Sequence, residues 1–184
     1  MKIRMMPVAK DGMTNEQQRI YEAIVAGPRG HAGGIFMTWL RSPGMADPAQ
    51  QLGEFLRFNS SLPLRLSELA ILVTARHWTS QFEWHAHAGI AAGAGLPPTA
   101  IEDIRQRRPP TALRDDEQVV YAFCESVYRN GRVADDVYAD AVRELGEAGV
   151  VELIGILGYY TLVALSFNVL GDPLPDGLPA PLPV

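Results

Sequence analysis

The chain has 184 residues, with 16 Lys and Arg against 21 Asp and Glu, and a formal net charge of −5. This length suits one compact domain, and 47% hydrophobic residues exclude global disorder. The acidic balance argues against nucleic-acid binding, since the longest basic cluster, Arg105 to Arg108, is short and interrupted. The one cysteine, Cys124, excludes an intrachain disulfide, a Cys-x-x-Cys redox pair and a cysteine-rich zinc site. We therefore expect a protein of the reducing cytoplasm.

Strand patterns are scarce, and turn residues divide the chain into segments with helical periodicity. Thr14 and Gln17 form a capping-box pattern, which predicts a helix that ends before the next Gly-Pro pair. Pro48 suits the first turn of a second helix, whose apolar residues recur at helical spacing. A long helical segment from about 65 to 94 follows, with a break expected near Thr79.

Turn residues also divide the second half of the chain into helical segments. Thr99 is expected to cap a short helix, and two amphipathic helices are expected over 115–129 and 135–148. The last helix covers 150–170, and the proline-rich tail 171–184 cannot continue it. We expect this apolar tail to pack in extended form. The predicted fold class is all-α, in a single domain covering the whole chain.

The segment 150–170 is also long enough to be tested as a membrane span. It carries one charge, Glu152, together with several Gly, Tyr, Ser and Asn residues. No Lys or Arg follows Arg143, so no positive flank would anchor or orient a span. We interpret the segment as a buried helix and expect no membrane partner.

Three of the four histidines, His77, His85 and His87, lie within eleven residues. On a helix Ser80, Glu83 and His87 share one face, while His85 points to the other side. A carboxylate one turn from an imidazole can hold its tautomer and raise its basicity, as a proton-transfer site requires. From the spacing alone, a surface Glu–His pair is the favoured interpretation.

A metal site is a further alternative for the same residues. The two histidines of His85-x-His87 diverge on a helix, and the chain lacks the paired Glu-x-x-His motifs of di-iron bundles. A mononuclear site at Glu68, Glu83 and His87 is conceivable, but we predict no metal and no cofactor.

Three neighbouring motifs resemble those of a known superfamily. They are Leu66-Ser-Glu-Leu-Ala-Ile-Leu72, Phe82-Glu-Trp-x-x-His87 and Ile90-Ala-x-x-Ala-Gly-Leu96. In this order they resemble the carboxymuconolactone decarboxylase and alkylhydroperoxidase-D-like superfamily, and the resemblance extends from about 14 to 170. It implies an orthogonal helical bundle of the alkylhydroperoxidase-D-like type and a homo-oligomer, either a trimer or a hexamer.

In the peroxidase branch of that superfamily, one helix carries Cys-x-x-Cys-x-x-x-His, with a Glu twelve residues before the first Cys. Matched position by position, the Glu is Glu68, the two cysteines are Ser80 and Glu83, and the histidine is His87. Both sulfurs are absent, so the resemblance does not imply a thiol peroxidase here. The decarboxylase branch likewise lacks the cysteines and keeps the Glu-x-x-x-His pair.

We therefore expect a cofactor-independent enzyme that decarboxylates or isomerises a small carboxylated lactone or a related intermediate of aromatic catabolism. His87 is the expected proton donor, Glu83 orients it, and Glu68 tunes the pair or acts as a second base. The expected substrate-binding residues are Ser80, Trp84, Arg76 and Arg41. One alternative is a non-catalytic binding or scaffold oligomer that has lost the thiols, and another is a peroxidase that uses Cys124.

Overall fold

The computed structural model describes residues 3–171, 174–175 and 178–183. Throughout these residues the regular elements are helices, and no strand occurs among them. The all-α prediction is confirmed.

The chain divides into two compact units, which are described separately. Unit 1 comprises Met1–Asn59 and Ser166–Pro173, and unit 2 comprises Ser60–Leu165 and Leu174–Val184. The longest helix, α8, contributes residues to both units. The prediction of a single domain over 1–184 stays a prediction.

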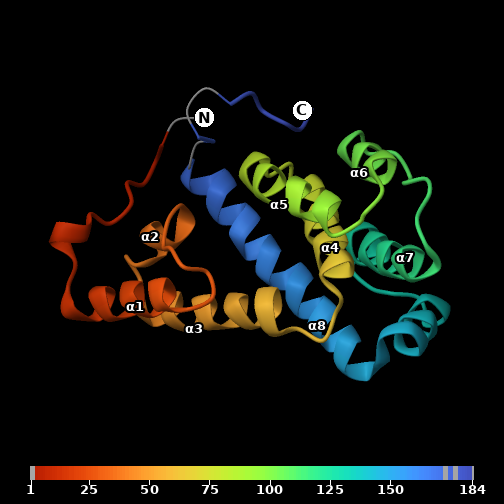
Figure 1. The fold of residues 1–184 in the computed structure, drawn as a ribbon, viewed down its shortest axis with the longest axis horizontal. Helices are drawn as coiled ribbons and strands as arrows, with labels where there is room; N and C mark the ends of the chain where they lie inside the picture. The colour runs from red at the N-terminus through yellow and green to blue at the C-terminus, as the bar shows by residue number, and fades with distance from the viewer. Residues whose placement is uncertain (1–2, 172–173, 176–177, 184) are drawn as a thin grey trace. The chain divides into compact units, whose positions relative to one another are not determined.

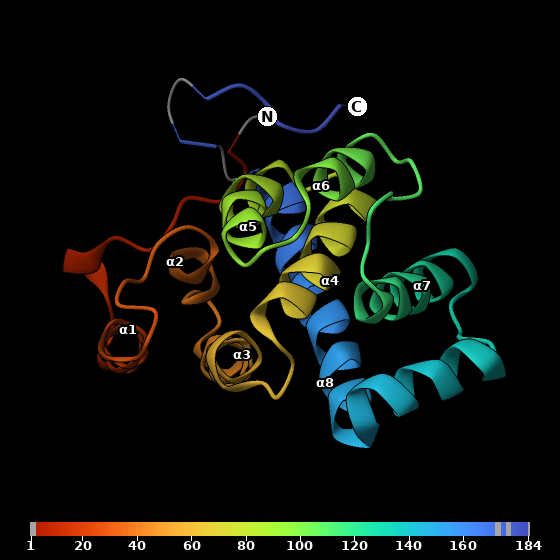
Figure 2. The same cartoon turned by 45° about the vertical axis from the view of Figure 1, so that its right-hand side comes forward.

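Unit 1 contains a short 3-10 turn and three α-helices before a π-helical turn. Their bounds are Lys10–Gly12 for the 3-10 turn, Asn15–Ala26 for α1, Ile35–Trp39 for α2, Pro43–Glu54 for α3 and Phe55–Asn59 for the π-helical turn. The predicted capping box is present, since Gln17 N donates to Thr14 Oγ1 at 3.3 Å and Thr14 N donates to Gln17 Oε1 at 2.9 Å. Helices α1 and α3 lie side by side (Figures 1 and 2).

The predicted start of the second helix is wrong. Helix α3 begins at Pro43, and Pro48 lies inside it rather than in its first turn. A proline at the first helical position is pre-organised for the helix, so Ser42-Pro43 begins it earlier than expected. Pro48 forfeits one backbone hydrogen bond, and burial of Ala46 and Gln50 stabilises the helix on both sides of it.

Unit 2 is built around α4, which spans Leu64–His77. Every residue from Leu66 to Arg76 is buried, as expected for a helix with neighbours on all sides. Those neighbours are α5 (Gln81–Gly93), α6 (Pro98–Arg105) and α7 (Asp115–Asn130), which surround α4 in Figure 2. The first turn of α6 begins at Pro98, with Pro97 before it, so the prediction that Thr99 caps this helix is wrong.

The predicted break between α4 and α5 is confirmed. Thr79 adopts the left-handed conformation, with φ of 49°. Ser80 N then donates to the Ala75 carbonyl at 2.8 Å and Thr79 N to the Arg76 carbonyl at 3.2 Å. This pair of bonds is a Schellman motif, which ends α4 and turns the chain directly into α5.

The last two predicted helices form one element, α8, spanning Asp135–Leu170. Its kink lies at Gly146, with φ of 70°, and not at Gly149 as expected. Gly149 instead allows a close approach, because a Cβ built there would lie 3.3 Å from Leu62 Cδ2.

Helix α8 is long and apolar enough to cross a membrane by length and composition, a test that core helices of soluble proteins also pass. Half of its most apolar window is buried. Val150 and Leu153 lie in the core, whereas Val151 is 68% and Ile154 is 55% exposed. The prediction of a buried helix therefore holds for one face of α8 only.

The described end of the tail packs on unit 2. Leu182 is buried and exchanges two backbone-to-side-chain hydrogen bonds with Gln81, at 3.0 and 2.8 Å. Arg105 Nη1 donates to the Pro181 carbonyl at 2.9 Å. The prediction of a packed tail is confirmed for these residues, and its parts at 172–173, 176–177 and 184 lie outside the described residues.

Candidate active site

The predicted catalytic residues meet in the interior of unit 2. His87, on α5, and Glu68, on α4, are 3% and 1% exposed, and His87 Nδ1 lies 2.8 Å from Glu68 Oε2. An ionised carboxylate only accepts hydrogen bonds, so Nδ1 donates its hydrogen to Glu68. That bond fixes the ring orientation and leaves Nε2, on the opposite side, as the nitrogen that can take up or release a proton.

Glu83 faces this second nitrogen. It lies one turn before His87 on α5, it is buried, and its Oε2 is 3.8 Å from His87 Nε2. This separation is too long for a hydrogen bond, although it is short enough for an ion pair once the imidazole is protonated. The imidazole therefore lies between two carboxylates, bonded to one of them and separated from the other.

Sequence reasoning missed the aromatic wall of this cluster. The Tyr160 ring, from α8, meets the His87 ring edge-on with centroids 5.1 Å apart, and Tyr159 meets Tyr160 in the same way at 5.4 Å. The Gly158-Tyr-Tyr run was the available signal. Helical periodicity does not tell which of two adjacent tyrosines faces a residue 73 positions earlier in the chain.

Ser80 occupies the cap position immediately before α5. It is fully buried, and its Oγ has no hydrogen-bond partner among the described residues. A buried hydroxyl without a partner is uncommon, because burial without a hydrogen bond costs free energy. Ser80 also precedes Glu83 and His87 by three and seven residues, a spacing that places residues on one face of a helix.

The other predicted substrate-binding residues are dispersed. Trp84 is buried on α5. Arg76 Nη1 donates to Thr79 Oγ1 at 3.0 Å, and Arg76 lines a separate pocket whose walls include none of the three catalytic candidates. Arg41 belongs to unit 1, where its Nε and Nη2 both donate to the Met6 carbonyl. The structure thus brings together His87, Glu68 and Glu83, and it gives Arg76 and Arg41 other partners.

The lone cysteine has no role at this site. Cys124 is completely buried on α7, and burial raises the pKa of its thiol far above the ordinary value. A thiol held in the neutral form is a poor nucleophile. This environment argues against the peroxidase alternative.

Among the described residues, no group of three or more His, Cys, Asp and Glu side chains has an arrangement that would hold a metal ion. The expected absence of metal and cofactor stays a prediction.

No family model matches the sequence, and no curated protein matches it significantly. Several solved structures, in contrast, do match this chain. A cysteine-to-alanine variant of the debrominase Bmp8, in complex with 2,3,4-tribromopyrrole, aligns with a TM-score of 0.73 at 11% identity, over 98% of this chain and 95% of that one. An uncharacterized peroxidase-related protein from Ralstonia eutropha, described as an alkylhydroperoxidase AhpD core, aligns with a TM-score of 0.73 at 15% identity, over 96% and 94%.

A protein of unknown function from Agrobacterium tumefaciens aligns with a TM-score of 0.65 at 14% identity, over 74% of this chain and 94% of that one. At such identities the likeness shows the fold alone. The chain therefore has the alkylhydroperoxidase-D-like helical fold, as the motif resemblance implied.

Proposed function

We propose that this protein is an acid–base enzyme that works without a cofactor and moves protons through His87 Nε2. The observation that carries the proposal is the buried imidazole, bonded to Glu68 at Nδ1 and facing Glu83 at Nε2. Glu68 sets the tautomer and orientation of the ring, and Glu83 lies where a proton must pass.

The energetics of this cluster favour a functional role. Burying charged groups costs several kcal/mol for each ion, and well-packed apolar residues of similar volume often stabilise a fold equally well. A titratable group enclosed with two others is characteristic of sites that transfer protons. The unpartnered Ser80 hydroxyl supports a ligand on the same helix face.

The reaction class that suits this site is decarboxylation or isomerisation of a small carboxylated lactone or a related ring acid. Loss of carbon dioxide from a carboxylate β to a carbonyl breaks a carbon–carbon bond, and its electron pair moves onto the carbonyl oxygen as an enolate. Protonated His87 then donates the Nε2 proton to carbon. The neutral imidazole regains a proton from solvent water on the side that faces Glu83, and the hydroxide left behind combines with the released carbon dioxide as bicarbonate.

The size of the expected substrate has support from the comparison. The debrominase of the same fold was crystallised with a tribromopyrrole, a small ring compound. We expect this chain to take a small ring acid as its partner, to act in the cytoplasm, and to bind neither nucleic acid nor membrane.

The test compares two histidines on one helix. His87→Ala removes the proposed proton carrier, and His85→Ala is the matched control because His85 is exposed on α5. With a panel of lactone acids and β-keto acids, carbon dioxide release or deuterium uptake from D₂O should fall by about 10²–10⁴-fold in His87→Ala and stay unchanged in His85→Ala. Full turnover by folded His87→Ala would overturn the proposal.

A second candidate is a binding or scaffold oligomer without catalysis. The exposed apolar side chains of α8, Val151 and Ile154 among them, favour subunit contacts. Light scattering should then give a trimer or hexamer that His87→Ala leaves intact. A wild-type protein that assembles in this way, yet turns over no member of the panel, would favour this candidate over the enzyme.

A further inference from the structure

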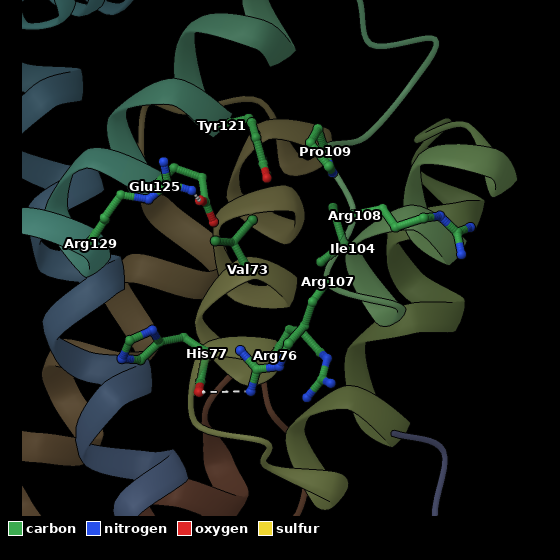
Figure 3. A pocket seen from close by; sticks show the side chains of 10 residues that line it. All are labelled: Val73, Arg76, His77, Ile104, Arg107, Arg108, Pro109, Tyr121, Glu125 and Arg129. Carbon is green, nitrogen blue, oxygen red and sulfur yellow. Dashed lines mark hydrogen bonds and ion pairs between the residues drawn. The ribbon is translucent and has the colours of Figure 1, made fainter. Parts of the chain in front are cut away.

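A pocket of about 250 Å³ lies in unit 2, between α4, α6 and α7 (Figure 3). The lining residues are Val73, Arg76, His77, Ile104, Arg107, Arg108, Pro109, Tyr121, Glu125 and Arg129. Four of these are arginines, and none belongs to the His87 cluster. Glu68 and Arg76 are eight residues apart on α4, which separates them by about 12 Å along the helix axis.

Within the part of the chain that the structure describes, two of the four arginines have no carboxylate partner. Arg108 pairs with Asp103 at 2.8 Å and Arg129 with Glu125 at 3.4 Å. Among the described residues, neither Arg76 nor Arg107 forms an ion pair with a carboxylate, and in Figure 3 both lie at one end of the pocket while Arg108 extends away from it.

The positively charged side chains of Arg76 and Arg107 are held close together by one shared hydrogen-bond acceptor. Arg76 Nη1 and Arg107 Nη2 each donate to Thr79 Oγ1 at 3.0 Å, so the two guanidinium groups are neighbours. Arg76 is 7% exposed, and its buried Nε has no partner among the described residues. Burial and the neighbouring charge of Arg107 lower the pKa of Arg76, as expected for cations placed together without an anion.

The backbone at this end of the pocket is strained. Thr79 and Arg107 have φ values of 49° and 57°, in the left-handed region that side chains other than glycine rarely adopt. Each follows the C-terminus of a helix, α4 for Thr79 and α6 for Arg107, where glycine is the usual residue. Strain of this kind persists where surrounding structure imposes it and concentrates at binding sites.

Beyond these two arginines the lining is mixed, with aliphatic side chains in the middle of the pocket and a polar far end. Val73 and Ile104 line the middle, and Tyr121 and Glu125 lie on α7, away from the unpaired arginines. Burial, with the nearby charge of Glu125, raises the pKa of Tyr121 to about 12, so its hydroxyl stays protonated at neutral pH. The Glu125 carboxylate pairs with Arg129 there at 3.4 Å, which leaves no unpaired cation at that end for a second negative charge.

We propose that this pocket binds a small organic monocarboxylate, whose carboxylate lies between Arg76 and Arg107 and whose apolar body contacts Val73 and Ile104. A carboxylate has two oxygens for the two guanidinium groups, and charge-assisted bonds of this kind are among the stronger polar contacts in proteins. Inorganic phosphate would satisfy the arginines but would leave Val73 and Ile104 without an apolar partner. This site is independent of the acid–base function proposed for His87.

Titration calorimetry with benzoate, in a buffer without organic anions and at low ionic strength, tests the site. Wild type should bind benzoate at one saturable site, and benzamide and inorganic phosphate more weakly. Arg107→Gln should weaken benzoate binding by about tenfold or more, since it removes one charge-assisted contact. Arg107 is exposed, so this variant is expected to fold, which thermal unfolding checks.

Two controls complete the experiment. Arg143→Gln makes the same change in net charge at an exposed arginine outside the pocket, and it should leave affinity unchanged. His87→Ala should also bind benzoate normally, whatever its effect on turnover. The proposal is overturned if wild type shows no saturable binding, if Arg107→Gln binds as well as wild type, or if benzamide or phosphate binds as tightly as benzoate.

Discussion

The His87 cluster (Glu68, Glu83 and His87) and the pocket that contains Arg76 and Arg107, called the arginine pocket below, both use ionisable residues of α4. They differ in the kind of group that lies beside the α4 residue. Glu68 lies against a group that can take the opposite charge, and both side chains are enclosed. Arg76 lies beside a second cation, with one buried nitrogen unpartnered, in a pocket that opens to solvent. The enclosed, hydrogen-bonded pair of Glu68 and His87 suits proton transfer, whereas two neighbouring guanidinium groups with no ion-pair partner among the described residues suit the binding of an anion.

The largest effect is expected from Glu68→Gln. The amide keeps the size of the side chain but removes the charge opposite the imidazole and the acceptor-only oxygen that sets its tautomer. Turnover on any substrate established for the wild type should fall by about 10²-fold or more. The pH profile of kcat should also change in Glu68→Gln. If Glu68 had a purely structural role, this profile would not be expected to change.

Glu83→Gln provides the comparison within the cluster. Glu83 lies beyond hydrogen-bond distance from Nε2, so this variant should retain the ring orientation and lose less turnover than Glu68→Gln. An unchanged rate in folded Glu68→Gln would contradict the assigned role.

Arg76→Met should separate binding from stability. It removes a cation that has no carboxylate partner among the described residues and fills the same buried space with an apolar chain. Benzoate affinity should fall by about tenfold or more. The free energy of unfolding should change by no more than about 1 kcal/mol, because losing the bonds to Thr79 and Pro183 offsets relief from repulsion.

Chemical denaturation measures this change. In the same assay, Glu68→Leu should destabilise the fold by about 2 kcal/mol or more, since it leaves buried His87 without its partner. If Arg76→Met and Glu68→Leu lose the same free energy of unfolding, the expected difference between the two sites is wrong.

Thr79→Gly tests the strain at the arginine pocket. Glycine adopts a positive φ without steric cost, so the variant should stabilise the protein by about 1 kcal/mol. It also removes the hydroxyl shared by Arg76 and Arg107, so benzoate should bind more weakly. Gly95→Ala, at φ of 93°, is the reverse change and should destabilise the protein. A destabilised Thr79→Gly would show that the left-handed turn is not strained.

The smallest expected effect is a pH dependence of stability at the arginine pocket. Burial and the Arg107 charge lower the pKa of His77 from 6.5, so the unfolded chain binds a proton at higher pH than the folded one. The neutral His77 ring therefore stabilises the folded protein fully above about pH 6.5. This stabilisation is lost as pH falls toward the lower pKa that His77 has in the folded protein. Asp103, whose pKa hydrogen bonds from Thr111 lower to about 2, stabilises the fold above about pH 4, and this contribution is lost only as pH falls below that value.

His77→Phe isolates this contribution. Phenylalanine retains a ring that can stack on Tyr128, where the His77 ring lies 4.3 Å away between centroids. Denaturation between pH 5 and 7 should show a weaker dependence on pH in the variant than in wild type. Identical slopes would mean that His77 does not titrate differently on folding.

Much of the local structure was predictable, because its causes lie within a few residues of one another. The Thr14 capping box begins α1, and the break at Thr79 separates α4 from α5. The shared face of Glu83 and His87 follows from helical spacing alone. The local patterns gave the wrong position where two candidate residues lie close together. Helix α3 begins at Pro43 and not near Pro48, and α8 is kinked at Gly146 and not at Gly149.

By itself the sequence determined the all-α class, most helix boundaries, the absence of a redox cysteine pair and the Glu–His spacing on one helix. Spacing alone did not separate a surface pair from a buried one, and the resemblance supplied Glu68. Only the tertiary structure decided that His87 is buried between Glu68 and Glu83 beside Tyr160, and that Arg76 belongs with Arg107 instead. The physical reason is distance along the chain. Capping and periodicity act over one or two turns, whereas these contacts depend on how α4 packs against α5, α6 and α7 and on how Tyr160 of α8 meets His87.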